Sequence, residues 1–255
     1  MILTDTHTHL YSSQLDEDRK EKVQRAMDQG INRFFIPAID SSYTTSMYEL
    51  EKAFPENIFL MMGLHPTSVK EDYKEQLRHV EQQFELRDFY AVGETGIDLY
   101  WDKSFLSQQQ EAFRFQIGLA KRKKLPVVIH CRDAFDEIFE VLESEKDENL
   151  FGIFHCFTGN EEQANIAISY NMKLGIGGVV TFKNGGIDKF LGNIPISNIV
   201  LETDSPYLAP APHRGKRNES SYLSLVANKV AEVYNIDPEK VAQITTQTSR
   251  EVFKV

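Results

Sequence analysis

Short hydrophobic runs alternate with longer amphipathic segments along the whole chain. The runs are rich in β-branched and aromatic residues and predict eight strands, at residues 1–10, 33–39, 59–66, 89–98, 126–132, 152–157, 172–178 and 198–206. Between several of them, apolar positions recur with the helical period, at residues 18–30, 73–87, 106–124, 134–145 and 160–171. Regular alternation of strands and helices predicts a parallel sheet.

Eight evenly spaced strand–helix units predict an α/β fold of one particular kind, a single (β/α)8 TIM barrel. An open doubly wound sheet rarely reaches eight regular units. Residues 221–253 predict the helix that closes the barrel and an extra C-terminal helix, which Asp237 caps and Pro238 begins. No low-complexity segment or Gly/Ser linker divides the 255 residues, so we expect one domain, residues 1–255.

Composition narrows the class of protein. The chain starts with no basic, apolar leader, and no apolar run is long enough to cross a bilayer. Its only cysteines, Cys131 and Cys156, suit a reducing compartment. We expect a cytoplasmic protein with no membrane contact and no obligate protein partner. A net charge of −10 argues against a broad basic face for nucleic acid and still allows a metal-dependent nuclease.

Polar side chains gather where the predicted strands end. In a (β/α)8 barrel the carboxyl ends of the strands meet at one face, which carries the active site. Five of the seven histidines and three carboxylates end predicted strands, namely His7, His9, His65, His130, His155, Glu94, Glu202 and Asp204. Side chains two residues apart on a strand share a face, so His7 and His9 point the same way.

So many titratable groups at one face indicate a metal site, because without a cation they would repel and desolvate one another. Imidazoles mixed with carboxylates suit divalent ions. Six ligands exceed one open site and suffice for two ions that share a carboxylate. We assign His7, His9, Glu94 and Asp204 to one ion, and Glu94, His130 and His155 to the other. Zinc, manganese and magnesium all remain open.

Other residues are expected around these ligands. Asp5 and Glu202 lie one layer deeper, where they would orient the ligating imidazoles. Alternation directs Cys131 and Cys156 toward the helix layer, away from the metals. Tyr100 and Trp101 would either stack on a base or cover the mouth of the barrel. Candidates for phosphate contact, with a solvated loop as the alternative for the basic cluster after the last strand, are His65, Arg132, His213, Arg214, Lys216 and Arg217.

A family resemblance rests on motifs spread over residues 5–219. They read "DTHTHL", "GLHP", "VGETGID", "VIHCR", "FHCFTG", "GIGG", "LETDSPYL" and "HRGKRNE". In this order they resemble the TatD family of metal-dependent deoxyribonucleases, which belongs to the amidohydrolase-like superfamily. The chain departs from the family pattern at Ser220, where a proline is usual, and at Thr8, where the family has Cys, Ala or Phe.

The resemblance implies a (β/α)8 barrel, two divalent ions and hydrolysis of DNA phosphodiester bonds, commonly as a 3′ to 5′ exonuclease. Its metal ligands fall on the six residues assigned above, and Glu202 matches an acidic position beside the metals. We expect single-stranded or frayed DNA as substrate and a metal-activated water as nucleophile. Asp204 is expected to orient that water and take its proton, with Glu94 as the other catalytic carboxylate.

Two alternatives remain at this stage. One is an amidohydrolase-like enzyme for a lactone, cyclic amide or phosphoester. Many such sites carry a carboxylated lysine at the end of the fourth strand, where this chain has Glu94. The other is a non-catalytic, metal-dependent binding scaffold. A degenerate scaffold is expected to have lost a ligand, and none is missing here.

Overall fold

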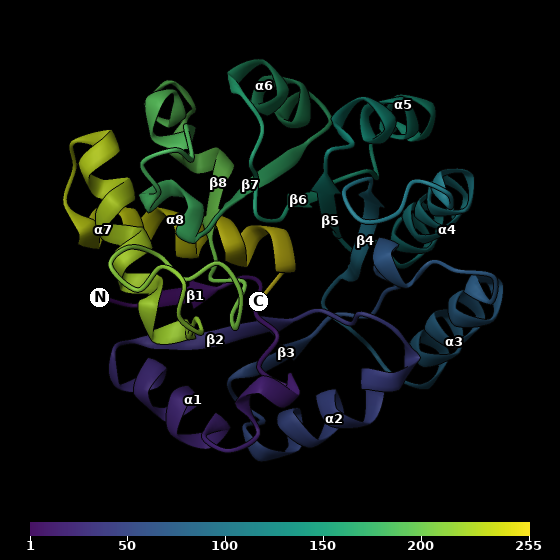
Figure 1. Cartoon of the computed structure of the whole chain (residues 1–255), viewed down its shortest axis with the longest axis horizontal. Coiled ribbons are helices and arrows are strands. Elements are labelled where there is room, and N and C mark those ends of the chain that lie inside the picture. The colour runs from purple at the N-terminus through teal and green to yellow at the C-terminus, as the bar shows by residue number, and fades with distance from the viewer.

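A ring of parallel strands occupies the centre of the computed structural model, which describes residues 1–255, and helices surround the ring (Figure 1). The strands are β1 (Leu3–Asp5), β2 (Ile31–Ile36), β3 (Ile58–Leu60), β4 (Val92–Asp98), β5 (Val127–Arg132), β6 (Gly152–Phe154), β7 (Met172–Ile176) and β8 (Ile199–Leu201). All eight fall within the predicted runs, apart from the first two residues of β2 and the first of β3.

Hydrogen bonds join the strands into a barrel. Two parallel ladders, β1-β2-β3 and β4-β5-β6-β7-β8, meet where Met62 pairs with Val92. At the other seam the amide of Thr6, just past β1, donates to Leu201 O of β8 (3.1 Å). The amide of Asp204 donates to His7 O across the same seam (2.9 Å). The predicted α/β barrel is therefore confirmed.

Helices follow seven of the eight strands. They are α1 (Arg19–Asp28), α2 (Thr44–Ala53), α3 (Tyr73–Leu86), α4 (Leu106–Lys123), α5 (Phe135–Glu145), α6 (Glu161–Ser169) and α7 (Leu223–Tyr234). Between β7 and β8 the chain forms four short 3₁₀ turns instead, within residues 178–198. This stretch contains several glycines and a proline, which disfavour a continuous helix.

The extra C-terminal helix, α8 (Pro238–Phe253), closes the amino-terminal end of the barrel. It begins at the predicted proline and crosses the ring of strands in Figure 1. Its last residues, Val252 and Phe253, join the apolar side chains that fill the barrel, and Phe253 stacks on Phe35 with ring centroids 3.7 Å apart. With this end plugged, the opposite end is the one free to hold a site.

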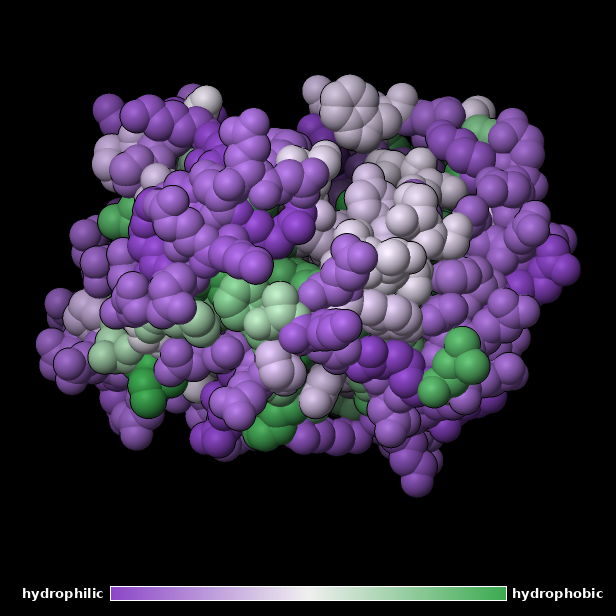
Figure 2. Space-filling model, turned by 90° about the horizontal axis from the view of Figure 1, so that it is seen from below, coloured by the Kyte–Doolittle hydropathy of each residue, from purple (hydrophilic) through white to green (hydrophobic).

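Figure 2 shows the hydropathy of one face of the molecule. The face drawn in Figure 2 is largely hydrophilic, with hydrophobic residues in a few small groups. None of the helices combines the length and apolar character needed to span a membrane.

Candidate metal centre

Six side chains converge at the carboxyl end of the barrel, as strand alternation predicts. We call His7, His9, Glu94, His130, His155 and Asp204 the candidate cluster. They come from β4 and β5 and from the ends of β1, β6 and β8. All except His130, which is half-buried, are buried. An open cavity of about 1020 Å³ above them is walled in part by five of the six, His7 excepted.

Glu94 lies at the middle of the candidate cluster, with its two oxygens facing different imidazoles. Oε1 lies 2.8 Å from Nδ1 of His130 and 2.8 Å from Nε2 of His155. Oε2 lies 3.2 Å from Nε2 of His7 and 3.7 Å from Nε2 of His9. One carboxylate is thereby shared between two separate pairs of histidines.

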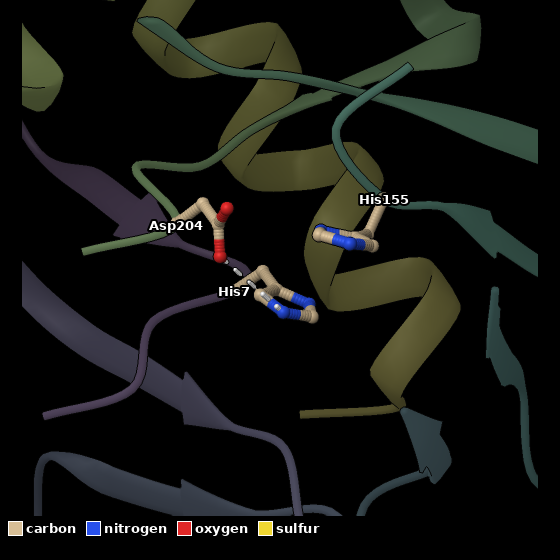
Figure 3. A group of neighbouring side chains, drawn as sticks. All are labelled: His7, His155 and Asp204. Atoms are coloured by element: carbon tan, nitrogen blue, oxygen red, sulfur yellow. Dashed lines mark ion pairs between the residues drawn. The ribbon is translucent and has the colours of Figure 1, made fainter. Parts of the chain in front are cut away.

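His7, His155 and Asp204 bring three distant elements together. The rings of His7 and His155 are stacked, with centroids 3.8 Å apart and planes at 15° (Figure 3). Asp204 Oδ1 lies 3.9 Å from Nε2 of His7 and 3.4 Å from Nε2 of His9. Nitrogen and oxygen atoms crowded in this way can share an ion, and these groups lie within the spacing that a metal ion requires.

Polar side chains behind the rings help to orient three of the imidazoles, two of them through hydrogen bonds. His9 Nδ1 lies 2.9 Å from the hydroxyl of Tyr11, which itself donates to Pro37 O. Tyr11 therefore accepts from Nδ1–H, and Nε2 of His9 is left to face the cluster. Glu202 Oε1 accepts from the amide of Cys156 and lies 3.4 Å from Nδ1 of His155, a close charge contact without a hydrogen bond. Carboxylates and hydroxyls so placed fix the ring orientation of metal-binding histidines.

Asp98 lies behind the ring of His130 and orients it through a hydrogen bond, a role that the sequence analysis did not predict. Its Oδ2 lies 2.9 Å from Nε2 of His130, so that Nδ1 of this ring faces Glu94. The sequence could have indicated this role, because Asp98 is four residues beyond Glu94 in the same strand and alternation places both side chains on one face. Tyr11, which holds His9, was also missed. Tyr11 is two residues past His9, so an extended backbone would place both side chains on the same side.

Burial and neighbouring charges shift the pKa values of Glu94 and His155 in opposite directions. Burial opposes the charge on Glu94, but His155, His65 and His7 outweigh it and hold the pKa of this carboxyl well below its usual value. Burial also lowers the pKa of His7. Burial opposes the charge on His155, yet Glu94 and Glu202 raise its pKa well above the ordinary value. The shifts thus favour an anionic Glu94, a neutral His7 and a charged His155.

His65 also reaches the cluster. Its Nε2 lies 3.2 Å from Glu94 Oε1 and 3.2 Å from Nδ1 of His130. The backbone amide of Thr67 donates to Nδ1 of His65 (3.1 Å), which assigns the ring proton to Nε2. His65 therefore presents a hydrogen-bond donor to the site, whereas Nε2 of His9 presents a lone pair.

Asp5 differs from expectation. It is fully buried, but it accepts hydrogen bonds from the amide (2.9 Å) and the hydroxyl (2.7 Å) of Thr203. No imidazole nitrogen contacts it, so it braces β1 against the segment after β8 instead of orienting a ligating ring. Burial raises the pKa of Asp5 to about 7.

Four basic residues line the mouth of the cavity, and one of them, Arg217, is paired with a carboxylate. Arg132, Arg214, Lys216 and Arg217 line the cavity. Arg214 lies over the ring of Phe182, with its guanidinium carbon 4.1 Å from the centroid, and Arg217 pairs with Asp18.

His213 does not line the cavity. It stacks on Tyr222 with ring centroids 4.1 Å apart, and its expected contact with phosphate stays a prediction. Cys131 packs against the main hydrophobic core, as alternation predicts, although it also borders the cavity, whereas Cys156 departs from expectation and lines the cavity. Cys156 has a left-handed backbone (φ 43°), so strand alternation does not extend to it.

Comparison with known proteins decides the family. The family model described as TatD related DNase matches residues 4–254. The chain belongs to the TatD family. It is 38% identical over 255 residues to YabD of Bacillus subtilis, an uncharacterized metal-dependent hydrolase, with the full length of both chains covered. It is 30% identical to the 3′-5′ ssDNA/RNA exonuclease TatD of Pectobacterium parmentieri, covering 98% of this chain and 99% of that protein.

Structural comparison agrees with the sequence match. The crystal structure of YJJV, a TatD homolog from Escherichia coli, superposes with a TM-score of 0.93 at 26% identity, covering 99% of this chain and 98% of that one. As a TatD member the chain is a metal-dependent hydrolase. The resemblance noted from the motifs is confirmed.

Proposed function

We propose that this TatD protein is a deoxyribonuclease that removes nucleotides from the 3′ end of single-stranded or frayed DNA with two divalent ions. One ion would be held by His7, His9, Glu94 and Asp204, and the other by Glu94, His130 and His155. The observation that carries the proposal is the position of Glu94, whose two oxygens face the two pairs of histidines. A carboxylate shared in this way suits a two-metal site for phosphodiester hydrolysis.

The residues fit metal ions on a second ground. Glu94 Oε2 is buried and accepts no hydrogen bond, although Nε2 of His7 lies 3.2 Å away. A buried carboxylate oxygen without a partner is costly, and a cation would compensate it. The mixed imidazole and carboxylate donors suit zinc or manganese, and magnesium less well.

Asp204 is our choice for the group that orients the attacking water and takes its proton. Bound divalent ions would lower the pKa of a water ligand toward about 7 and neutralise phosphate charge. Burial opposes ionisation of Asp204, but His9 and His155 hold its pKa below the usual value, so an anionic oxygen is present to accept a proton. It lies at the cavity wall, where substrate can reach it.

The phosphate would be held by a few donors, since the net charge of −10 excludes broad attraction. His65 presents Nε2–H beside Glu94. Arg132, Arg214 and Lys216 line the cavity without a carboxylate partner within 4.0 Å, whereas Arg217 is paired with Asp18. These donors position the backbone and carry no sequence preference. The exonuclease name of the Pectobacterium relative supports the same substrate class.

The test is nucleotide release from single-stranded DNA labelled at the 3′ or the 5′ end. Chelated protein is reloaded with zinc, manganese or magnesium and compared with Asp204→Asn and with Asp28→Asn, an exposed carboxylate on α1. We expect metal-restored release from the 3′ end, lost in Asp204→Asn and unchanged in Asp28→Asn. Metal-loaded wild-type protein that releases no nucleotide with any ion would overturn the proposal and direct the search to lactone and amide substrates.

A further inference from the structure

Two large aromatic side chains stand exposed in the loop between β4 and α4. Trp101 is 71% exposed and Tyr100 is 53% exposed, and their rings meet edge to face with centroids 4.8 Å apart. Trp101 also lines the cavity that holds the candidate cluster. Side chains this exposed cover little of the barrel, so a role as a hydrophobic cover does not account for them.

Arg132 completes this surface. Its guanidinium carbon lies 3.7 Å from the ring centroid of Tyr100 and 5.4 Å from that of Trp101. Arg132 lines the same cavity and has no carboxylate partner. A planar cation stacked on aromatic rings, with its charge not neutralised by an acid, favours a ligand that has both a flat π-system and a negative charge.

Asp98 fixes this aromatic surface relative to the candidate cluster. Its Oδ1 accepts hydrogen bonds from the amides of Tyr100 (3.0 Å) and Trp101 (3.3 Å), while its Oδ2 lies 2.9 Å from Nε2 of His130. The same carboxylate therefore holds a ring of the cluster and the start of the aromatic loop. Gln109 of α4 accepts from the amide of Asp98 (2.9 Å) and restrains it further.

We propose that Tyr100, Trp101 and Arg132 form a stacking platform for one nucleobase of a single strand whose backbone reaches the candidate cluster. The base stacks on the exposed face of Trp101, which the edge-to-face contact with Tyr100 positions, and Arg132 supplies the positive charge beside it. The inference rests on the proposed nuclease function and specifies its substrate. Every base has a π-face, so such a platform tolerates any sequence. In a duplex these faces are covered by neighbouring base pairs, so the platform selects single-stranded or frayed ends.

Intrinsic fluorescence isolates the platform, because Trp101 is the single tryptophan of the chain. Metal-loaded protein is titrated with a short phosphorothioate-linked oligothymidylate, which resists hydrolysis, and with an abasic strand of the same length and linkage. We expect the oligothymidylate to quench the emission of Trp101 and the abasic strand to bind with little quenching. Equal quenching by both strands would overturn the platform, because the abasic strand keeps the phosphates and lacks the bases.

Labelled strands and polarisation extend the test to variants without tryptophan. Trp101→Ala is expected to bind oligothymidylate about tenfold more weakly, Trp101→Phe to recover most of the loss, and both to bind the abasic strand as wild type does. Leu86→Ala, which removes an exposed apolar side chain from α3, serves as the control and should change neither affinity. Unchanged binding of oligothymidylate by Trp101→Ala would overturn the inference.

Failure of the inference is separable from failure of the proposed function. Wild-type protein that cleaves DNA with metal and whose Trp101 variants bind and cleave normally would refute the platform alone. Wild-type protein that neither binds nor cleaves any strand would refute the nuclease, and the platform with it.

Discussion

Asp98, which is buried, and His130, which is half-buried, form a carboxylate–imidazole pair, with Oδ2 of the aspartate 2.9 Å from Nε2 of the histidine. The pair indicates which nitrogen of His130 would bind a metal ion. Nε2 and Nδ1 lie in hydrogen-bond range of Asp98 Oδ2 and of Glu94 Oε1 (2.8 Å) respectively; a proton held at Nε2 by Asp98 would leave Nδ1 free to bind a metal ion. A residue that contacts no metal in our assignment thus determines how well His130 can act as a ligand.

Asp98→Asn is expected to weaken metal binding. An amide at this position removes the negative charge that polarises the ring and can present either its oxygen or its NH2 group to Nε2. Loss of such a partner costs about 10- to 100-fold in metal affinity. The affinity is measured by competition with a chelator.

Asp102→Asn is the matched control for this experiment. Asp102 lies in the same loop but pairs with Lys70, and its exposed carboxylate has no imidazole partner. It should bind metal as wild type does. An Asp98→Asn protein with wild-type metal affinity would show that the pair does not tune the site.

Strand alternation predicted the candidate cluster because parallel strands end together at one face of a barrel. His7 and His9 needed only the two-residue period, and Glu94, His130, His155 and Asp204 needed only the positions of the strand ends. The family motifs then fixed the same residues independently. The two-residue period of strands and the barrel topology were enough to predict which side chains converge.

Loop geometry could not be obtained in this way. His213 and Arg214 are adjacent in sequence, yet one stacks on Tyr222 and the other lies over Phe182 at the cavity. Cys156 leaves the strand pattern because its backbone turns left-handed directly after His155. Such directions depend on tertiary contacts of residues outside the strands, for which the sequence has no periodic signal.

Glu94→Gln is expected to reduce the number of bound ions. The substitution removes the charge that two pairs of histidines share, and a neutral amide seldom bridges two cations. Metal content of the protein after dialysis, together with the rate of 3′ release, measures the effect. We expect wild type to retain two ions per chain, and the variant to retain at most one and to lose at least about 100-fold in rate. Two tightly bound ions in Glu94→Gln would contradict the bridging assignment.

His65→Ala is expected to separate rate from metal binding. The proton on Nε2 makes His65 a donor toward substrate, so its removal should lower the single-turnover rate about 10²- to 10³-fold, as for loss of one electrostatic donor. Metal content should stay at the wild-type value. Loss of one ion from His65→Ala would instead identify it as a ligand and refute the tautomer that the Thr67 amide assigns.

Phe253→Ala is expected to destabilise the fold without changing the site. Phe253 is buried at the plugged end of the barrel, stacked on Phe35 at 3.7 Å, and a truncation of this kind costs about 3–5 kcal/mol. The candidate cluster lies at the opposite end, so metal content and rate per folded molecule should remain at wild-type values. Urea denaturation of metal-loaded protein measures the free energy of unfolding, with Leu86→Ala, 77% exposed, expected within about 0.5 kcal/mol of wild type. A Phe253→Ala protein as stable as Leu86→Ala would show that α8 is not needed to complete the barrel core.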